Sequence, residues 1–115
     1  MTSHPVDQMR GFIVDAETYG LAEQAGMFCE ALSEILGADQ SLFDGFEFGC
    51  HMDEPYEMVF MWDRGSLRVK LSFLGDPDDS TWFVGDDRRR FRGAIGMDRC
   101  ASCRRMLDSM RSIRE

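Results

Sequence analysis

Residues 56–73 read YEMVFMWDRGSLRVKLSF, two apolar runs joined by a short polar stretch. The first run is apolar almost throughout, which is typical of a central strand. The second run alternates apolar with polar residues, as expected of a strand with one buried and one solvated face. Between them, Asp63-Arg64-Gly65-Ser66 offers a glycine for the positive φ angle that a tight connection favours. We therefore predict a β-hairpin over this stretch.

A period of two residues continues on both sides of the predicted hairpin. Upstream, apolar positions alternate with polar ones over residues 46–52. Downstream, residues 81–84 and 89–95 predict two further strands around a tight turn at 85–87. Short connections join neighbouring strands in antiparallel fashion, so we expect an antiparallel β-meander of about five strands.

Helical periodicity flanks the predicted sheet on both sides. Apolar residues recur at spacings of three and four over residues 17–36, and Gly37 stands where a glycine would end that helix. Asp98 is a suitable N-cap for a closing helix. Pro5 could open a further helix, although the first 14 residues are ambiguous. The sequence thus predicts one α+β domain over residues 1–115, an antiparallel meander flanked by an N-terminal and a C-terminal helix.

The length and composition fit a single domain with a substantial core. The chain has 115 residues, of which 43% are hydrophobic, so intrinsic disorder is disfavoured. No apolar run approaches the roughly 18 residues of a membrane-spanning helix. Residues 1–5 lack the basic and apolar segments of a signal peptide. We therefore expect a cytoplasmic location and four free thiols.

The net charge of −8 is distributed unevenly along the chain. Residues 1–87 carry 18 acidic side chains against four basic ones, whereas residues 88–115 carry nine arginines against three acids. An acidic body opposes binding to nucleic acid, which is itself a polyanion. We expect neither direct nucleic-acid binding nor membrane binding.

The stretch Cys100-Ala101-Ser102-Cys103 raises the question of a metal or redox site. A thioredoxin-like redox site would need further strands after the closing helix, but only 12 residues follow Cys103. Zinc needs four ligands, and no second pair of cysteines or histidines is available. Buried, inert thiols are the favoured interpretation, and zinc held by Cys100 and Cys103 is the alternative. We expect no cofactor.

The sequence contains no recognisable catalytic constellation. Cys50 and His51 are neighbours in a predicted strand, so their side chains point to opposite faces and cannot act as a pair. His4 is expected in a frayed terminus. The acidic turn at residues 76–80 lacks the glycine and the flanking helices of a calcium loop. We expect a protein without enzymatic activity, although a site built from scattered carboxylates such as Asp53 stays an alternative.

The one basic cluster is Arg88-Arg89-Arg90-Phe91-Arg92. One interpretation is a clamp for phosphate or carboxylate, with Phe91 available for stacking. The other is an edge strand whose charges discourage sheet-to-sheet association and pair with the preceding aspartates. The sequence leaves both interpretations open.

Clustered carboxylates favour a binding protein as the functional class. Fixed negative charge in turns can occupy the basic groove of a nucleic-acid-handling partner, as DNA mimics, nuclease-toxin immunity proteins and phage inhibitors of bacterial defence (anti-CRISPR-like proteins) do. We expect a protein partner with a basic surface, bound by a monomer or homodimer. The predicted contact residues are the turn acids and the strand arginines: Asp53, Glu54, Asp76, Asp78, Asp79, Asp86, Asp87, Arg89, Arg90 and Arg92.

A second functional class is a chaperone or adaptor with a methionine-rich surface. The chain has nine methionines, and methionine adapts readily to irregular binding partners. In composition and element order the chain is loosely similar to type III secretion chaperones. It lacks the helix that those proteins carry midway through their sheet. The same methionines also suit a soft core.

Overall fold

The computed structural model describes residues 4–15, 21–37, 41–53 and 56–114. Three α-helices and one 3₁₀ helix form: α1 (Pro5–Asp15), α2 (Leu21–Leu36), η1 (Ser41–Phe43) and α3 (Arg99–Arg114). Five strands lie between η1 and α3 in the chain: β1 (Glu47–Asp53), β2 (Glu57–Arg64), β3 (Leu67–Phe73), β4 (Thr81–Gly85) and β5 (Arg90–Ala94). The predicted α+β fold, a five-stranded antiparallel meander with helices at both ends of the chain, is confirmed.

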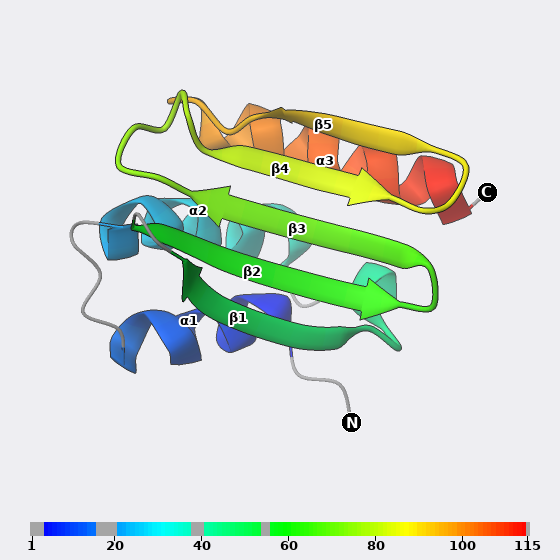
Figure 1. Ribbon diagram of the computed structural model, residues 1–115, viewed down its shortest axis with the longest axis horizontal. Helices are drawn as coiled ribbons and strands as arrows, with labels where there is room; N and C mark the ends of the chain where they lie inside the picture. Colours follow the sequence, from blue (N-terminus) through cyan, green and yellow to red (C-terminus); the bar gives the residue numbers. More distant parts are fainter. Residues whose placement is uncertain (1–3, 16–20, 38–40, 54–55, 115) are drawn as a thin grey trace.

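Each strand pairs antiparallel with its neighbour in sequence, in the order β1-β2-β3-β4-β5 (Figure 1). The predicted hairpin is the pair β2–β3, in which Arg64 lies opposite Leu67. Only Gly65 and Ser66 connect these two residues, and Gly65 has a φ of 60°. Glycine adopts such an angle without steric cost, which explains the tight connection.

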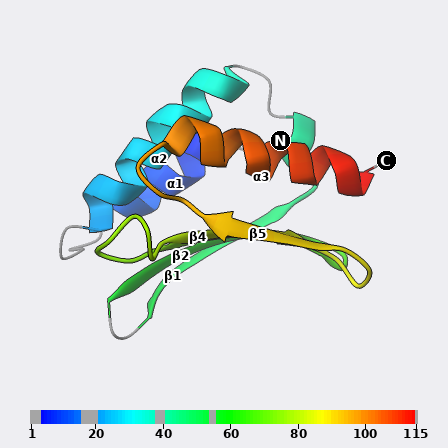
Figure 2. The same ribbon diagram turned by 90° about the horizontal axis from the view of Figure 1, so that it is seen from above.

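The helices cover one face of the sheet and leave the other face uncovered (Figure 2). Alternate strand residues such as Phe60, Trp62 and Leu71 point toward the helices and are buried in the core. The residues between them, including Lys70 and Phe83, lie on the uncovered face, which we call the open face. The molecule therefore has two layers and one solvent-exposed sheet surface.

The helix boundaries follow from local hydrogen bonds. Gly37 has a φ of 56°, and its N–H donates to the carbonyl of Ser33 at 2.8 Å, which ends α2 as predicted. Asp98 caps α3, because its Oδ1 accepts from the N–H of Ala101 at 3.0 Å. Among the described residues, no helix combines the length and apolarity needed to cross a bilayer.

The ambiguous first segment forms α1, and two polar side chains fix it to the rest of the molecule. His4 Nδ1 accepts from the N–H of Val6 at 3.2 Å, and its Nε2 lies 3.0 Å from the carbonyl of Gly37. The expectation that His4 lies in a frayed terminus is therefore wrong. Further along α1, Gln8 Oε1 accepts from the indole N–H of the buried Trp62 at 2.8 Å.

Candidate functional site

The meander places alternate connections at opposite ends of the sheet. The β1–β2 and β3–β4 connections lie at one end, and the β2–β3 and β4–β5 connections lie at the other (Figure 1). The predicted contact acids are therefore divided. Asp53, Asp76, Asp78 and Asp79 share the first end, whereas Asp86 and Asp87 lie at the second. Glu54 lies outside the described residues.

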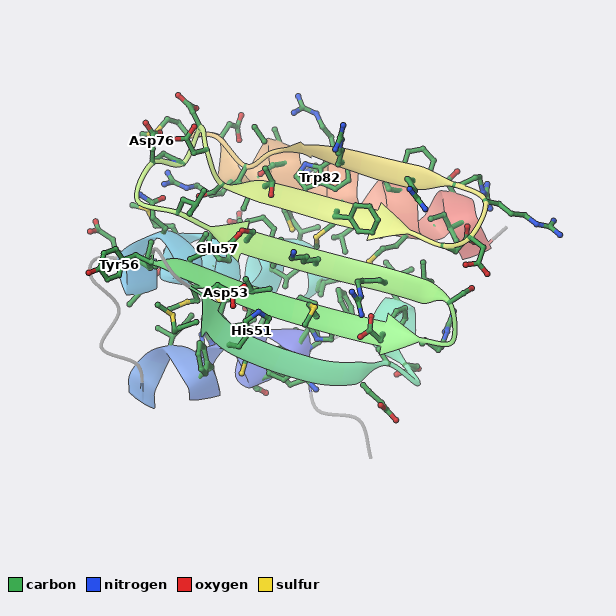
Figure 3. All side chains as sticks on the ribbon, viewed as in Figure 1. His51, Asp53, Tyr56, Glu57, Asp76 and Trp82 are labelled. Atoms are coloured by element: carbon green, nitrogen blue, oxygen red, sulfur yellow. The ribbon has the colours of Figure 1, made fainter. Side chains whose placement is uncertain are left out.

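We define the acidic end as Asp53, Tyr56, Glu57, Asp76, Asp78 and Asp79. Four of these residues are labelled in Figure 3, where they lie toward the same end of the sheet. Asp53 pairs with His51 at 3.0 Å, and the carboxylate of Glu57 accepts from the Ser72 hydroxyl. Among the described residues, no arginine or lysine forms an ion pair with any of these five carboxylates. Their charge is therefore not neutralised by neighbouring guanidinium or ammonium groups.

Backbone hydrogen bonds hold the acidic β3–β4 connection in place. Asp76 Oδ1 accepts from the N–H of Asp78 at 2.9 Å, and the Asp76 carbonyl accepts from the N–H groups of Asp79 and Ser80, both at 3.1 Å. The fully buried Ser80 accepts from the N–H of Leu74 at 2.9 Å. The carboxylates on this connection are thus presented on a fixed backbone, which lowers the entropy cost of binding.

Tyr56 lies at the tip of the β1–β2 connection and was not anticipated from the sequence. It is 56% exposed and has a φ of 63°, the one non-glycine residue with positive φ in the described part of the chain. This conformation costs of order 1–3 kcal/mol for a bulky residue. An aromatic ring held this way beside Asp53 and Glu57 can act as a binding anchor, because exposed tyrosines are frequent hot spots.

At the opposite end, Asp86 has a structural role. Its Oδ1 accepts from the N–H groups of Arg88 at 2.8 Å and of Arg89 at 2.9 Å, which closes the β4–β5 connection. The backbone hydrogen bond from Arg89, with that from Arg88, holds the pKa of this carboxyl below its usual value. Asp86 is therefore committed to its own turn and is separated from the acidic end.

The basic cluster divides between three roles. β5 is an edge strand of the sheet. Just before it, Arg89 donates from Nη2 to the carbonyl of Ile113, near the end of α3, at 2.9 Å. Phe91 packs against the core on the helix-facing side and cannot serve as the stacking surface. Arg90 and Arg92 point to the open face, where they lie opposite Gly85 and Phe83.

A cavity of about 600 Å³ lies on the open face next to these arginines. Strands β3 to β5 contribute Arg68, Lys70, Phe83 and Arg90 to its lining. Asp63, Asp86 and Asp87 also line it, and Arg68 is bonded to Asp63 at 2.7 Å. Sequence reasoning missed Lys70 and Phe83 as site residues, although alternation over residues 67–73 already placed Lys70 on the solvated face.

The cysteines give little sign of metal or redox chemistry. Burial raises the pKa of both Cys29 and Cys103 to about 12, so both thiols are protonated at neutral pH. Cys50 packs against the core, and His51 lies on the open face, as the alternation predicts. Across residues 4–15, 21–37, 41–53 and 56–114, no three His, Cys, Asp or Glu side chains are grouped so that they could hold a metal ion.

Half of the described methionines belong to the core. Met9, Met58, Met106 and Met110 are buried, as a soft core requires. A second group is exposed: Met27, Met52 and Met97. Met27 and Met97 line a groove of about 330 Å³ between α2 and the start of α3.

The site therefore comprises two surfaces, the acidic end and the cavity on the open face. Comparison of the chain with known protein families, with curated proteins and with solved structures finds no match.

Proposed function

We propose that this protein is a small acidic binding protein, without catalytic activity of its own, that docks its acidic end onto a basic partner. The observation that carries the proposal is the placement of Asp53, Glu57, Asp76, Asp78 and Asp79 at one end of the sheet, without an arginine or lysine partner among the described residues. Charges arranged in this way steer a cationic surface into contact and select against anionic ones.

The partner class follows from the chemistry of the acidic end. Carboxylates displayed on two neighbouring connections resemble a short row of phosphates, which is what a nucleic-acid-binding groove accepts. Tyr56 supplies an apolar contact of the kind that anchors an interface. A protein bound in such a groove excludes nucleic acid, so the proposed role is that of an inhibitor or immunity protein acting in the cytoplasm.

The test compares two variants with the same change in net charge. Asp78→Asn/Asp79→Asn removes two charges from the acidic end, and Glu30→Gln/Glu34→Gln removes two from the exposed side of α2. Binding to a protamine peptide, an arginine-rich polypeptide that packages DNA, is measured by titration calorimetry at several salt concentrations. We expect the first variant to bind about tenfold more weakly with a shallower salt dependence, and the second to bind nearly as the parent does.

Equal losses in the two variants would show that net charge alone governs binding and would contradict a localised docking surface. Binding that is insensitive to salt would contradict the electrostatic mechanism.

An adaptor function is the second candidate, favoured by the groove between Met27 and Met97. Met97 is 71% exposed, and large apolar side chains at that exposure are typical of adaptable binding surfaces. An adaptor would bind an apolar peptide there. Met97→Ser should weaken such binding several-fold, whereas Met52→Ser, at the far edge of the sheet, should leave it unchanged.

A further inference from the structure

Phe83 lies between two cations in one row across the open face. In the pairing register, Lys70 on β3 lies directly opposite Phe83 on β4, and Arg92 on β5 lies directly opposite Phe83 on its other side. Side chains directly opposite one another on neighbouring strands are about 5 Å apart at Cβ. The row therefore places an aromatic ring within reach of two positive charges.

The position of the Phe83 ring depends on a glycine. A Cβ atom at Gly85 would lie 2.7 Å from Phe83 Cζ and 3.1 Å from the carbonyl oxygen of Arg89. No side chain fits in that space, so the Phe83 ring lies over the Gly85 backbone. The other side of the Phe83 ring lines the cavity, where the ring is partly exposed to solvent.

Three cations beside this ring have no partner within the described part of the chain. Lys70, Arg90 and Arg92 form neither an ion pair nor a side-chain hydrogen bond with any described residue. Arg68 and Arg89, by contrast, are engaged by Asp63 and by the carbonyl of Ile113. Among the cations of β3 and β5, those without such a partner are thus the three near Phe83.

The acids that line the cavity do not neutralise these cations directly. Asp63 is engaged by Arg68 through both of its carboxylate oxygens, at 2.7 and 3.3 Å. Asp86 Oδ1 is committed to the β4–β5 connection, and Asp87 is exposed at the rim. The lining contains as many acids as bases, but Lys70 and Arg90 form no ion pair with any described carboxylate and can therefore bind an anionic ligand.

We propose that the open-face cavity binds a mononucleotide, with the base stacked on Phe83 and the phosphate held by Lys70 and Arg90, which both line the cavity. Guanidinium and ammonium groups provide charge-assisted hydrogen bonds to phosphate, and an aromatic face stacks on any base. The cavity has a volume of about 600 Å³, similar to that of small-ligand sites, and is broadly open to solvent.

A single nucleotide fits the charge distribution better than a nucleic-acid strand does. Beyond the cavity, the open face carries three carboxylates that have no arginine or lysine partner among the described residues, Glu47, Asp53 and Glu57. A strand that crosses the sheet would meet these charges and be repelled, whereas a mononucleotide stays beside Lys70 and Arg90. The inference is independent of the acidic end, so the two proposals can fail separately.

The test titrates adenosine monophosphate into isotope-labelled protein and follows the backbone amides by NMR. We expect saturable shifts confined to residues of β3, β4 and β5. Lys70→Met/Arg90→Gln should weaken binding by about tenfold or more, because two charge-assisted hydrogen bonds are lost. Arg104→Gln, an exposed cation on α3, should leave the affinity unchanged. Asp78→Asn/Asp79→Asn should also retain binding, which separates this site from the acidic end.

A second set of probes separates the two halves of the ligand. Phe83→Leu keeps apolar bulk but removes the aromatic face, so it should weaken adenosine monophosphate by about fivefold and leave inorganic phosphate unaffected. The thermal midpoint of each variant reports whether the fold is retained. Shifts that are absent at millimolar adenosine monophosphate, or unchanged in Lys70→Met/Arg90→Gln, would overturn the proposal. Tighter, steeply salt-dependent binding of a twelve-residue oligothymidine would also overturn it, in favour of a strand-binding surface.

Discussion

His4 joins two helices through its two ring nitrogens. Because Nδ1 accepts from the N–H of Val6, the proton of the neutral ring is on Nε2, which donates to the carbonyl of Gly37 at the end of α2. The side chain thus satisfies an N–H in the first turn of α1 and the carbonyl of Gly37, the residue directly after α2. The start of α1 and the end of α2 are fixed together by this single residue.

We predict that His4→Ala lowers the free energy of unfolding by about 1–2 kcal/mol, the usual cost of a lost helix cap. Urea unfolding followed by circular dichroism measures the change. His51→Ala is the matched control, because His51 is partly exposed and bonds only to Asp53 among the described residues. Equal effects of the two substitutions would contradict a capping role for His4.

Asp86 provides a prediction about pH. The N–H groups of Arg89 and Arg88 stabilise its charged form, so the pKa of the folded carboxyl lies below the usual 3.8. A carboxyl with a lowered pKa adds stability at pH values above 3.8, and that contribution disappears as the pH falls through the folded pKa. An NMR titration of the side-chain carboxyl carbon should give a midpoint below 3.8.

Asp86→Asn is the control for this titration. The amide oxygen still accepts from the backbone N–H groups but does not titrate, so the variant should lose less stability on acidification than the parent does. An Asp86 midpoint at or above the usual value would contradict the role of the backbone hydrogen bonds.

The indole of Trp82 on β4 lies over Gly93 on β5, where a side chain would collide with it. A Cβ atom at Gly93 would lie 2.8 Å from Nε1 of the buried Trp82, which has no hydrogen-bond partner among the described residues. We predict that Gly93→Ala displaces the indole and destabilises the protein by about 1–3 kcal/mol. Gly49→Ala on β1 meets no atom within 4 Å and should be nearly neutral. The thermal midpoints of the two variants measure the difference, and a similar midpoint for both would contradict the packing argument.

The elements themselves were predictable, but their contacts were not. Alternation over residues 67–73 and the glycine at 65 determine the central hairpin locally, so sequence was sufficient for it. Helix α1 is held by the bond between Gln8 and Trp62, which are 54 positions apart, so no local pattern could settle it. The row through Phe83 likewise depends on the register of three strands.

At the scale of the molecule, the predicted meander already implied that the acidic turns lie at two opposite ends of the sheet. Successive connections of a meander fall at alternate ends, so the turn at residues 76–80 and the turn at residues 85–87 cannot share a surface. The expectation that both turns contribute to one docking surface therefore conflicted with the meander. The exposed position of Tyr56 could not be predicted from the sequence, because its positive φ angle arises only in the folded connection.

The concentration of carboxylates predicts a dependence of stability on salt. Like charges at the acidic end repel one another, and salt screens that repulsion over about 10 Å at 0.1 M ionic strength. We predict that the thermal midpoint rises by about 1–3 °C between low and physiological salt. Asp78→Asn/Asp79→Asn should reduce that rise, and Glu30→Gln/Glu34→Gln should change it less. A midpoint that falls with salt would show that attractive ion pairs outweigh the repulsion.

The backbone hydrogen bonds of the β3–β4 connection bear on how its side chains can diversify. The carbonyls of Ser80 and Pro77 accept from the N–H groups of Ile95 at 2.8 Å and of Gly96 at 2.9 Å, so this connection is bonded to the segment that leads into α3. These bonds involve backbone atoms only. The exposed side chains of Asp78 and Asp79 could therefore be exchanged while the scaffold persists, which would let recognition change faster than architecture.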